Sequence, residues 1–246
     1  PIMLLIAGGW LIVQVAGVDV AGAVQAVFMP LQSALTSPVG FVFFCFLKCF
    51  IYSMGISTWV LTPVDEPVKL AVITANLELV AAGVATYQNL GIFTETFMFC
   101  TYLWIGGVGC TLSLCLLMMF ICKSSELKAL GRACIVPGIF NINEPIIFGA
   151  IAWNPLLMLP MWLQGIILPI VTYIFTKVIP FAPIPRIQFD LWYCPYPIST
   201  FIATQGSITG VIFAILTFVL SAVIWFPFVK AYDDQKVKEE TAAIKA

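Results

Sequence analysis

The stretch that decides the fold is GIFNINEPIIFG, residues 138–149. Asn141, Asn143 and Glu144 are its polar residues, and the residues around them are apolar enough for a membrane helix. A carboxylate inside a membrane is costly unless it faces a cavity or a charged partner. Pro145 has no backbone N–H and disfavours helical geometry at the preceding residue, so we expect the helix to break at Glu144.

Two interpretations of this carboxylate are open. In transporters, the unpaired backbone groups of a broken helix line the substrate site. Asparagine side chains both donate and accept hydrogen bonds, so Asn141, Asn143 and Glu144 together suit a ligand rich in hydroxyl groups. Alternatively, Glu144 pairs with a lysine or arginine and only fixes helix packing. The coincidence of a break with a charge favours the ligand site.

The composition predicts a membrane protein. Of the 246 residues, 61% are hydrophobic and only 9% are charged. A soluble domain carries about 25% charged residues, so too little polar surface is present here to cover a water-soluble globule. We therefore predict an all-α polytopic membrane protein surrounded by membrane lipid. The net charge of -1 provides no basic field, so we expect no nucleic-acid partner.

Apolar runs of about 20 residues predict about five transmembrane helices. The predicted spans are residues 2–18, 39–61, 97–122, 146–176 and 207–229. Other segments mix apolar residues with charges or prolines, and irregular backbone survives at membrane depth only where protein or water surrounds it. The predicted re-entrant segments are residues 63–91, 134–149 and 180–206.

These elements predict three parts of the chain. Residues 1–38 are interpreted as a truncated transmembrane helix and an amphipathic linker, residues 39–230 as a substrate-binding transmembrane domain, and residues 231–246 as a cytoplasmic tail. Short basic loops lie on the cytoplasmic side. Residues 123–132 and the tail are both rich in lysine, and two predicted spans return the chain to the same side. The mixed charges of the tail favour an exposed helix over a docking element.

Two further segments are candidate binding regions. Trp192 lies in an aromatic cluster, residues 192–197, which suits either stacking on a sugar or a belt at the membrane interface. The small residues among residues 104–109 favour close helix packing. Thr111 follows them and is a candidate substrate contact.

The remaining polar residues give weaker signals. Asn76 and Glu78 face either a pocket or interfacial water, and we expect Lys48 to be paired or to extend to the interface. The eight cysteines match no zinc-ligand spacing, and the chain has no histidine. We therefore expect no metal and no cofactor.

Four segments together resemble a known family. They are residues 104–112, 127–149, 197–204 and 226–233. They resemble enzyme IIC of the bacterial sugar phosphotransferase system, in its lactose/cellobiose (diacetylchitobiose) family. The similarity runs from about Val39 to Asp234. Members are nearly twice as long, so the chain resembles their C-terminal, sugar-binding half.

The resemblance implies a permease subunit in the bacterial inner membrane, with its C-terminal tail in the cytoplasm. Such a subunit binds a disaccharide such as cellobiose, lactose or diacetylchitobiose and carries it across while its C6 hydroxyl is phosphorylated. The phosphate comes from a phosphocysteine on enzyme IIB, a separate partner. The chain would therefore be the translocating subunit of a protein-phosphocysteine–sugar phosphotransferase, and family members are homodimers.

The resemblance also implies roles for individual residues. Glu144 corresponds to the glutamate beside the reacting hydroxyl, which it would orient or deprotonate. Trp192 corresponds to a sugar-stacking tryptophan, and Thr204 is a candidate substrate contact in a matching segment. Met54 stands where family members carry a histidine near the sugar and the phosphoryl-transfer site, and the chain has no histidine.

The missing histidine leaves several functions open. Either the lineage handles a different sugar or it has lost efficient phosphotransfer. A shifted register near Met54 is a third explanation, although no shift restores a histidine. One alternative function is a degenerate homologue that binds or passes sugar without phosphorylating it. Another is an ion-coupled secondary transporter, which would need a second ionisable group near Glu144.

Overall fold

The computed structural model describes residues 29–245, and the regular elements in this range are all helices. Helix α3 (Pro38–Ser53) packs against α9 (Pro155–Tyr173), which packs against α11 (Ile208–Lys245). Helix α11 also packs against α6 (Thr111–Phe120). The all-α prediction is confirmed for the part of the chain that the structure describes.

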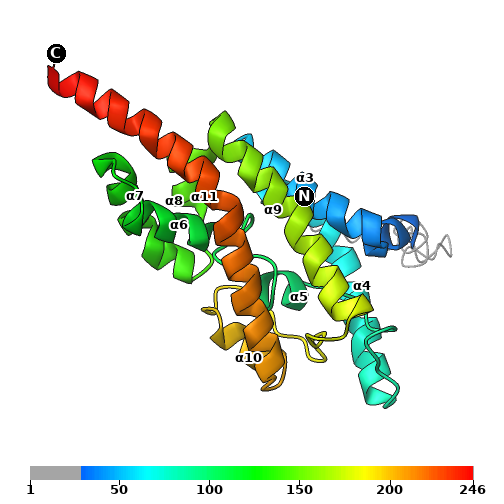
Figure 1. The fold of residues 1–246 in the computed structure, drawn as a ribbon. Coiled ribbons are helices and arrows are strands. Elements are labelled where there is room, and N and C mark those ends of the chain that lie inside the picture. Colours follow the sequence, from blue (N-terminus) through cyan, green and yellow to red (C-terminus); the bar gives the residue numbers. More distant parts are fainter. Residues whose placement is uncertain (1–28, 246) are drawn as a thin grey trace, which may run out of the picture.

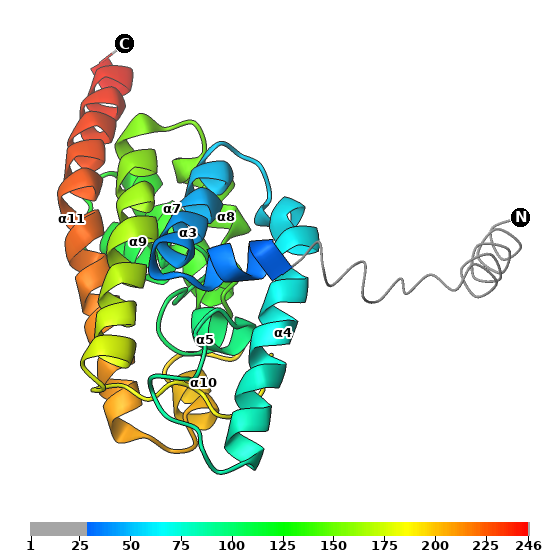
Figure 2. The same cartoon turned by 90° about the vertical axis from the view of Figure 1, so that its right-hand side faces the viewer.

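Shorter elements connect these helices (Figure 1). They are η1 (Thr58–Leu61), α5 (Glu95–Cys100), α7 (Ser125–Ile139), α8 (Glu144–Ile146), the π-helical turns η2 (Ile147–Ile151) and η3 (Ile174–Val178), and α10 (Ile198–Ala203). Helix α4 (Thr62–Ala81) lies at the edge of the molecule opposite α11 (Figure 2).

The chain bends by 89° between the short helix Met29–Thr36 and α3. Ser37 caps α3, because its hydroxyl accepts a hydrogen bond from the Gly40 backbone N–H at 3.0 Å. Only glycine fits at position 40, since a Cβ atom there would lie 1.8 Å from the carbonyl oxygen of Ala34. The predicted truncated span lies in residues 1–28, outside the described residues.

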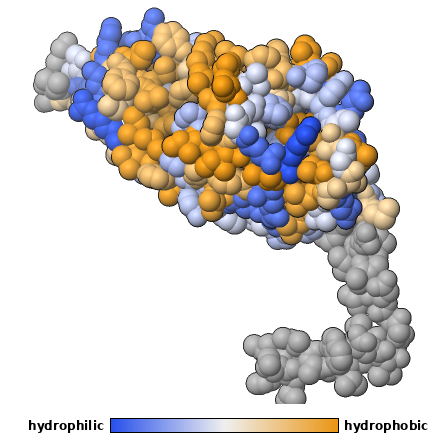
Figure 3. Space-filling view, turned by 90° about the horizontal axis from the view of Figure 1, so that it is seen from below, coloured by the Kyte–Doolittle hydropathy of each residue, from blue (hydrophilic) through white to orange (hydrophobic). Residues whose placement is uncertain are grey.

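The described residues contain two helices that are long and apolar enough to cross a membrane, or three if the bent pair counts as one span. They are Pro155–Val178, Ile208–Ala243, and the pair Met29–Thr36 and Pro38–Ser53. Hydrophobic side chains cover much of the face in Figure 3. The exposed apolar residues of α11 include Ile208, Ile215, Leu216, Val219 and Val223. A surface this apolar suits lipid, and the protein is an all-α membrane protein.

The span predicted at residues 97–122 is wrong. Helix α5 ends at Cys100 and α6 covers only Thr111–Phe120, with irregular backbone between them. Gly106 and Gly107 in this connection have φ angles of 83° and 93°, which an α-helix does not contain. The lack of charges in residues 97–122 therefore predicted too long a helix. Glycine residues with positive φ angles interrupt it.

The segment predicted as re-entrant, residues 63–91, is partly helical, and its re-entrant path stays a prediction. Its first part is α4, a continuous helix of 20 residues. Three of its four charged residues, Asp65, Glu66 and Lys69, form ion pairs, and Glu78 is exposed. Lys69 Nζ lies 2.7 Å from Glu66 Oε2, and Lys48 Nζ lies 2.7 Å from Asp65 Oδ2. The predicted pairing of Lys48 is thereby confirmed, and irregular backbone begins only after Ala82 caps α4.

The C-terminal tail continues α11 and contacts the start of α7. The Asp233 carboxylate accepts hydrogen bonds from the backbone N–H groups of Lys123, at 2.8 and 2.9 Å, and of Ser124, at 2.8 Å. Glu240 Oε1 accepts the Ser124 hydroxyl at 2.7 Å. These contacts place the basic segment and the tail at the same end of the molecule, as predicted. The tail is a mostly exposed helix, as predicted, but it also docks on the start of α7, which was not predicted.

Replacing Asp233 by alanine should destabilise the junction between α11 and α7. We expect a loss of about 1.5–3 kcal/mol, because hydrogen bonds to a charged group are lost and the backbone N–H groups stay partly buried. Denaturant unfolding of the purified protein in detergent measures the change. Asp234→Ala is the control, since Asp234 is exposed and Asp233 is buried. An equal loss in the two variants would contradict the role of Asp233.

Candidate functional site

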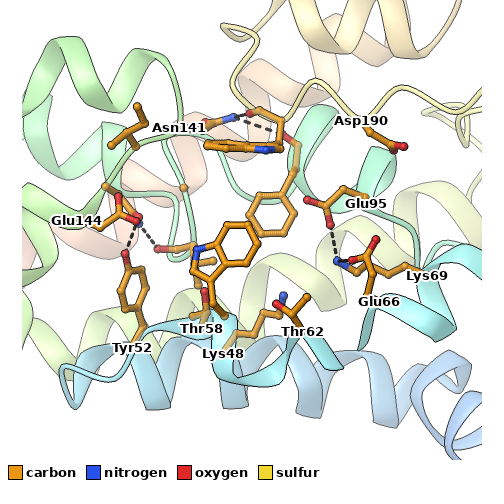
Figure 4. Close-up of a pocket in the computed structure, with 17 residues that line it drawn as sticks. Lys48, Tyr52, Thr58, Thr62, Glu66, Lys69, Glu95, Asn141, Glu144 and Asp190 are labelled. Carbon is orange, nitrogen blue, oxygen red and sulfur yellow. Dashed lines mark hydrogen bonds and ion pairs between the residues drawn. The ribbon is translucent and has the colours of Figure 1, made fainter. Parts of the chain in front are cut away.

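A cavity of about 590 Å³ lies between α3, α4, α5 and the broken helix after α7 (Figure 4). Small-molecule sites typically enclose about 300–1,000 Å³. The polar lining consists of Lys48, Tyr52, Thr58, Thr62, Glu66, Lys69, Glu95, Asn141, Asn143, Glu144 and Asp190. The aromatic lining adds Trp59, Phe99 and Trp192. Polar and aromatic surfaces therefore meet in one partly open cavity.

A helix break is present next to Glu144, but it lies over residues 140–143 and Glu144 itself is helical. Helix α7 ends at Ile139, and Asn141 adopts the left-handed region with φ of 60°. Glu144 begins α8, with Pro145 in its first turn. Glu144 is exposed and lines the cavity, and no lysine or arginine within residues 29–245 forms an ion pair with it. The geometry therefore favours a ligand-facing carboxylate over one that only fixes helix packing.

Asn141 joins three segments of the chain. Its Oδ1 accepts a hydrogen bond from Gly106 N at 2.6 Å, and its Nδ2 donates to the carbonyl oxygens of Phe99, at 3.4 Å, and Trp192. The residue is only 6% exposed. Although Asn141 lines the cavity, its amide atoms are occupied, so its main effect is to hold Trp192 and Phe99 in place.

Asn143 is held in the same way against the glycine-rich connection. Its Nδ2 donates to Val108 O at 2.9 Å, and its Oδ1 accepts from Tyr52 Oη at 3.3 Å. Gly107 lies directly against this amide, because a Cβ atom on Gly107 would be 2.5 Å from Asn143 Cγ. Residues 104–109 were predicted to favour close packing. They do so here, and Gly107 and Val108 also line the cavity.

Gly107→Ala should displace Asn143 from its place in the cavity wall. We expect a loss of about 1–3 kcal/mol in unfolding free energy, because the new methyl group overpacks the site. Gly83→Ala is the matched control, since Gly83 also has a positive φ, of 71°, but a Cβ atom there meets nothing within 4 Å. Denaturant unfolding in detergent compares the variants. Equal losses would show that backbone strain alone is responsible.

Three predicted site residues near α3 and α4 are not among the lining residues. Asn76 is buried and pairs with Gly91, donating to its carbonyl oxygen at 2.8 Å and accepting from its N–H at 2.7 Å. Glu78 is an exposed residue of α4. Met54 caps the C-terminus of α3, although the nearby Tyr52 does line the cavity.

The two predicted threonines also lie outside the lining. The Thr111 hydroxyl donates to Gly106 O at 2.5 Å, and the Thr204 hydroxyl donates to Thr200 O at 2.6 Å. Both hydroxyls are buried and stabilise local backbone. Of the predicted residues, the structure brings together Glu144, Asn141, Asn143 and Trp192 around the cavity.

A group of charged lining residues was not predicted. Lys69 Nζ lies 2.6 Å from Glu95 Oε2, 2.7 Å from Glu66 Oε2 and 3.5 Å from Asp65 Oδ2. The spacing of Asp65, Glu66 and Lys69 on one helix predicts pairing among themselves. The contribution of Glu95 could not be foreseen, because it comes from a different helix.

Comparison with known proteins gives consistent results. The model of the family described as phosphotransferase system, EIIC matches residues 1–165. The lactose-specific EIICB component of Lactococcus lactis subsp. lactis is 34% identical over 228 residues, which cover 91% of this chain and 39% of that protein. The cellobiose-specific EIIC component of Geobacillus stearothermophilus is 41% identical over 152 residues, or 61% of this chain and 33% of that protein.

A solved structure shares the fold. The crystal structure of ChbC, the IIC component from the N,N'-diacetylchitobiose-specific phosphotransferase system, matches with a TM-score of 0.79 and 33% identity. The match covers 86% of this chain and 48% of ChbC. The chain therefore spans less than half the length of these relatives. Since the family model matches residues 1–165 of 246, the chain belongs to the EIIC family of the phosphotransferase system.

Proposed function

We propose that the protein is the sugar-binding part of an EIIC permease, which takes a disaccharide into the cavity and translocates it for phosphorylation at C6 by phosphorylated enzyme IIB. Cellobiose, lactose and diacetylchitobiose are the first candidates, because they appear in the names of relatives. The observation that carries the proposal is Glu144, which lines the cavity at a helix break and forms no ion pair with a described lysine or arginine.

The lining suits a neutral sugar. A sugar ring has C–H groups on its faces and hydroxyl groups around its edge. The aromatic side chains of Trp59, Phe99 and Trp192 offer surfaces for the faces, and the hydroxyls of Thr58 and Thr62 can donate and accept hydrogen bonds. Both kinds of group occur in one cavity, which supports a polyhydroxylated ligand.

Glu144 has a specific role in the proposed reaction. The C6 oxygen of the sugar bonds to phosphorus while the S–P bond of the IIB phosphocysteine breaks, and the hydroxyl proton passes to the Glu144 carboxylate. A general base must lie within hydrogen-bond reach of the proton that it removes. A cavity-facing carboxylate at the break meets this requirement for a hydroxyl group placed beside it.

The full-length natural protein in membrane vesicles tests this function. We would add phosphorylated enzyme IIB and labelled cellobiose, lactose or diacetylchitobiose, and look for sugar 6-phosphate inside the vesicles. Its appearance supports the permease. Sugar that binds and crosses without phosphorylation supports the degenerate homologue instead, for which the absence of histidine is the motivating observation.

An ion-coupled transporter is favoured by a different observation. Ionisable side chains other than Glu144 line the same cavity, among them Lys69, Glu66 and Asp190. This second candidate predicts that sugar uptake stops when the proton and sodium gradients are collapsed. The permease predicts uptake that depends on phosphorylated IIB and continues without either gradient.

The membrane topology and assembly are part of the proposal. The contact between Ser124 and Glu240 supports a basic segment and a tail on one side. By the positive-inside rule, that side is the cytoplasm. We assign residues 39–230 to the substrate-binding domain and residues 231–246 to the tail. By analogy with the family, the full-length protein is a homodimer in the bacterial inner membrane.

A further inference from the structure

The cavity has a charged end that the proposed reaction leaves unused. We define the charged end as Glu66, Lys69, Glu95 and Asp190, all of which line the cavity. In Figure 4 these residues lie on the right, and Glu144 lies on the left with Tyr52 below it. The cavity therefore has two separate polar ends, and only one of them contains the proposed base.

Lys69 organises the charged end. Its Nζ lies 2.6 Å from Glu95 Oε2 and 2.7 Å from Glu66 Oε2, and its side chain is only 7% exposed. The side chains of Glu66 and Glu95 are 43% and 22% exposed. Both carboxylates lie closest to Lys69 through Oε2, and within residues 29–245 the Oε1 atom of each glutamate accepts no hydrogen bond. Each carboxylate therefore keeps an oxygen that can accept a hydrogen bond from a ligand.

A buried ion pair between Asp65 and Lys48, of which Lys48 lines the cavity, holds Lys69 in place. Asp65 is fully buried, and its Oδ2 lies 3.5 Å from Lys69 Nζ and 2.7 Å from Lys48 Nζ. Taking several charges out of water is costly, and apolar residues often stabilise a fold equally well. Because this ion-pair network is costly and lies beside an open cavity, we infer that it holds hydrogen-bond acceptors in position before a ligand binds.

We propose that Glu66 and Glu95, positioned by Lys69 and assisted by Asp190, accept hydrogen bonds from hydroxyl groups of the sugar ring that lies away from Glu144. The charged end would thereby select a disaccharide over a monosaccharide. This inference rests on the proposed function, because it names the part of the same site that binds the second ring of the disaccharide. Carboxylates suit this role because they accept the hydrogen bonds that sugar hydroxyls can donate, and they would repel an anionic ligand.

The test compares two sugars in each variant. The tightest-binding member of cellobiose, lactose and diacetylchitobiose is titrated into the full-length protein in detergent, beside its own monosaccharide, with binding followed by calorimetry. The variants are the double change Glu66→Gln with Glu95→Gln, and Asp190→Asn, which leaves the ion pairs of Lys69 intact. Glu78→Gln is the matched control, because Glu78 lies on the same helix as Glu66 but outside the cavity lining.

We expect the double variant to bind the disaccharide at least about tenfold more weakly and the monosaccharide unchanged, because charged hydrogen bonds are lost only to the second ring. Asp190→Asn should weaken only the disaccharide, by several-fold, and Glu78→Gln should change neither sugar. If Asp190→Asn leaves the disaccharide unaffected, or if both sugars weaken equally in the double variant, the charged end does not read the second ring. If the unmodified protein binds none of these sugars, the proposed function itself fails.

Discussion

Glu144→Gln should keep the sugar bound and nearly abolish its phosphorylation. Glutamine preserves the size and hydrogen-bonding capacity of the side chain but cannot take up the hydroxyl proton. Removing a general base typically lowers a rate by about 10²–10⁴-fold. The sugar affinity should change far less, since the aromatic walls and the charged end remain. Single-turnover formation of sugar 6-phosphate from phosphorylated IIB, at saturating sugar, measures the rate directly.

The matched control for this experiment is another carboxylate of the same cavity. Glu95→Gln alters the charged end, so it should weaken sugar binding while phosphorylation at saturating sugar stays close to the parent rate. The two variants thus separate chemistry from recognition. Phosphorylation by Glu144→Gln at the parent rate would remove Glu144 from the chemical step.

Asp65→Asn should cause the largest loss of stability among single changes in and directly behind the cavity wall. Asp65 is 0% exposed, and it lies 2.7 Å from the Nζ atom of Lys48, whose side chain is 6% exposed. Removing one partner of a buried ion pair typically costs about 3–5 kcal/mol, because the other charge stays buried without compensation. Domains are stable by only about 5–15 kcal/mol, so this variant should unfold far more readily in detergent.

A double variant tests whether the buried charge is the cause. Replacing both partners with apolar residues, as in Lys48→Met with Asp65→Leu, leaves neither charge of this pair in the interior. Lys69 keeps its contacts with Glu66 and Glu95 in this variant. We expect the double variant to recover most of the stability lost by Asp65→Asn. If the double variant is as unstable as the single one, packing and not charge explains the loss.

The helix break next to Glu144 was predictable because its cause is local. Proline is favoured in the first turn of a helix and disfavoured in later turns, so Pro145 marks where a new helix begins. The apolar run of α11 was predictable for the same reason, since membrane length and hydropathy are properties of one segment. The family resemblance added the expectation that the helix break and Trp192 both lie at the sugar-binding site. In the structure, Glu144 and Trp192 line the same cavity.

The rest depended on contacts between distant segments. Nothing in the local sequence shows that Gly107 must be small because Asn143 packs against it, or that Glu95 reaches Lys69. A polar side chain can also turn to nearby backbone instead of a ligand. Thr111 does so, and hydropathy could not distinguish it from a residue that faces the cavity.

Asn141 also links recognition to the stability of the whole chain. Its hydrogen bonds to Gly106, Phe99 and Trp192 assemble the cavity wall from segments that separate when the protein unfolds. A ligand of that wall binds only the folded state, so at 100 times its Kd it adds about 2.7 kcal/mol to the free energy of unfolding. The rise in melting temperature across a panel of sugars therefore ranks them by affinity, with no IIB and no membrane gradient required.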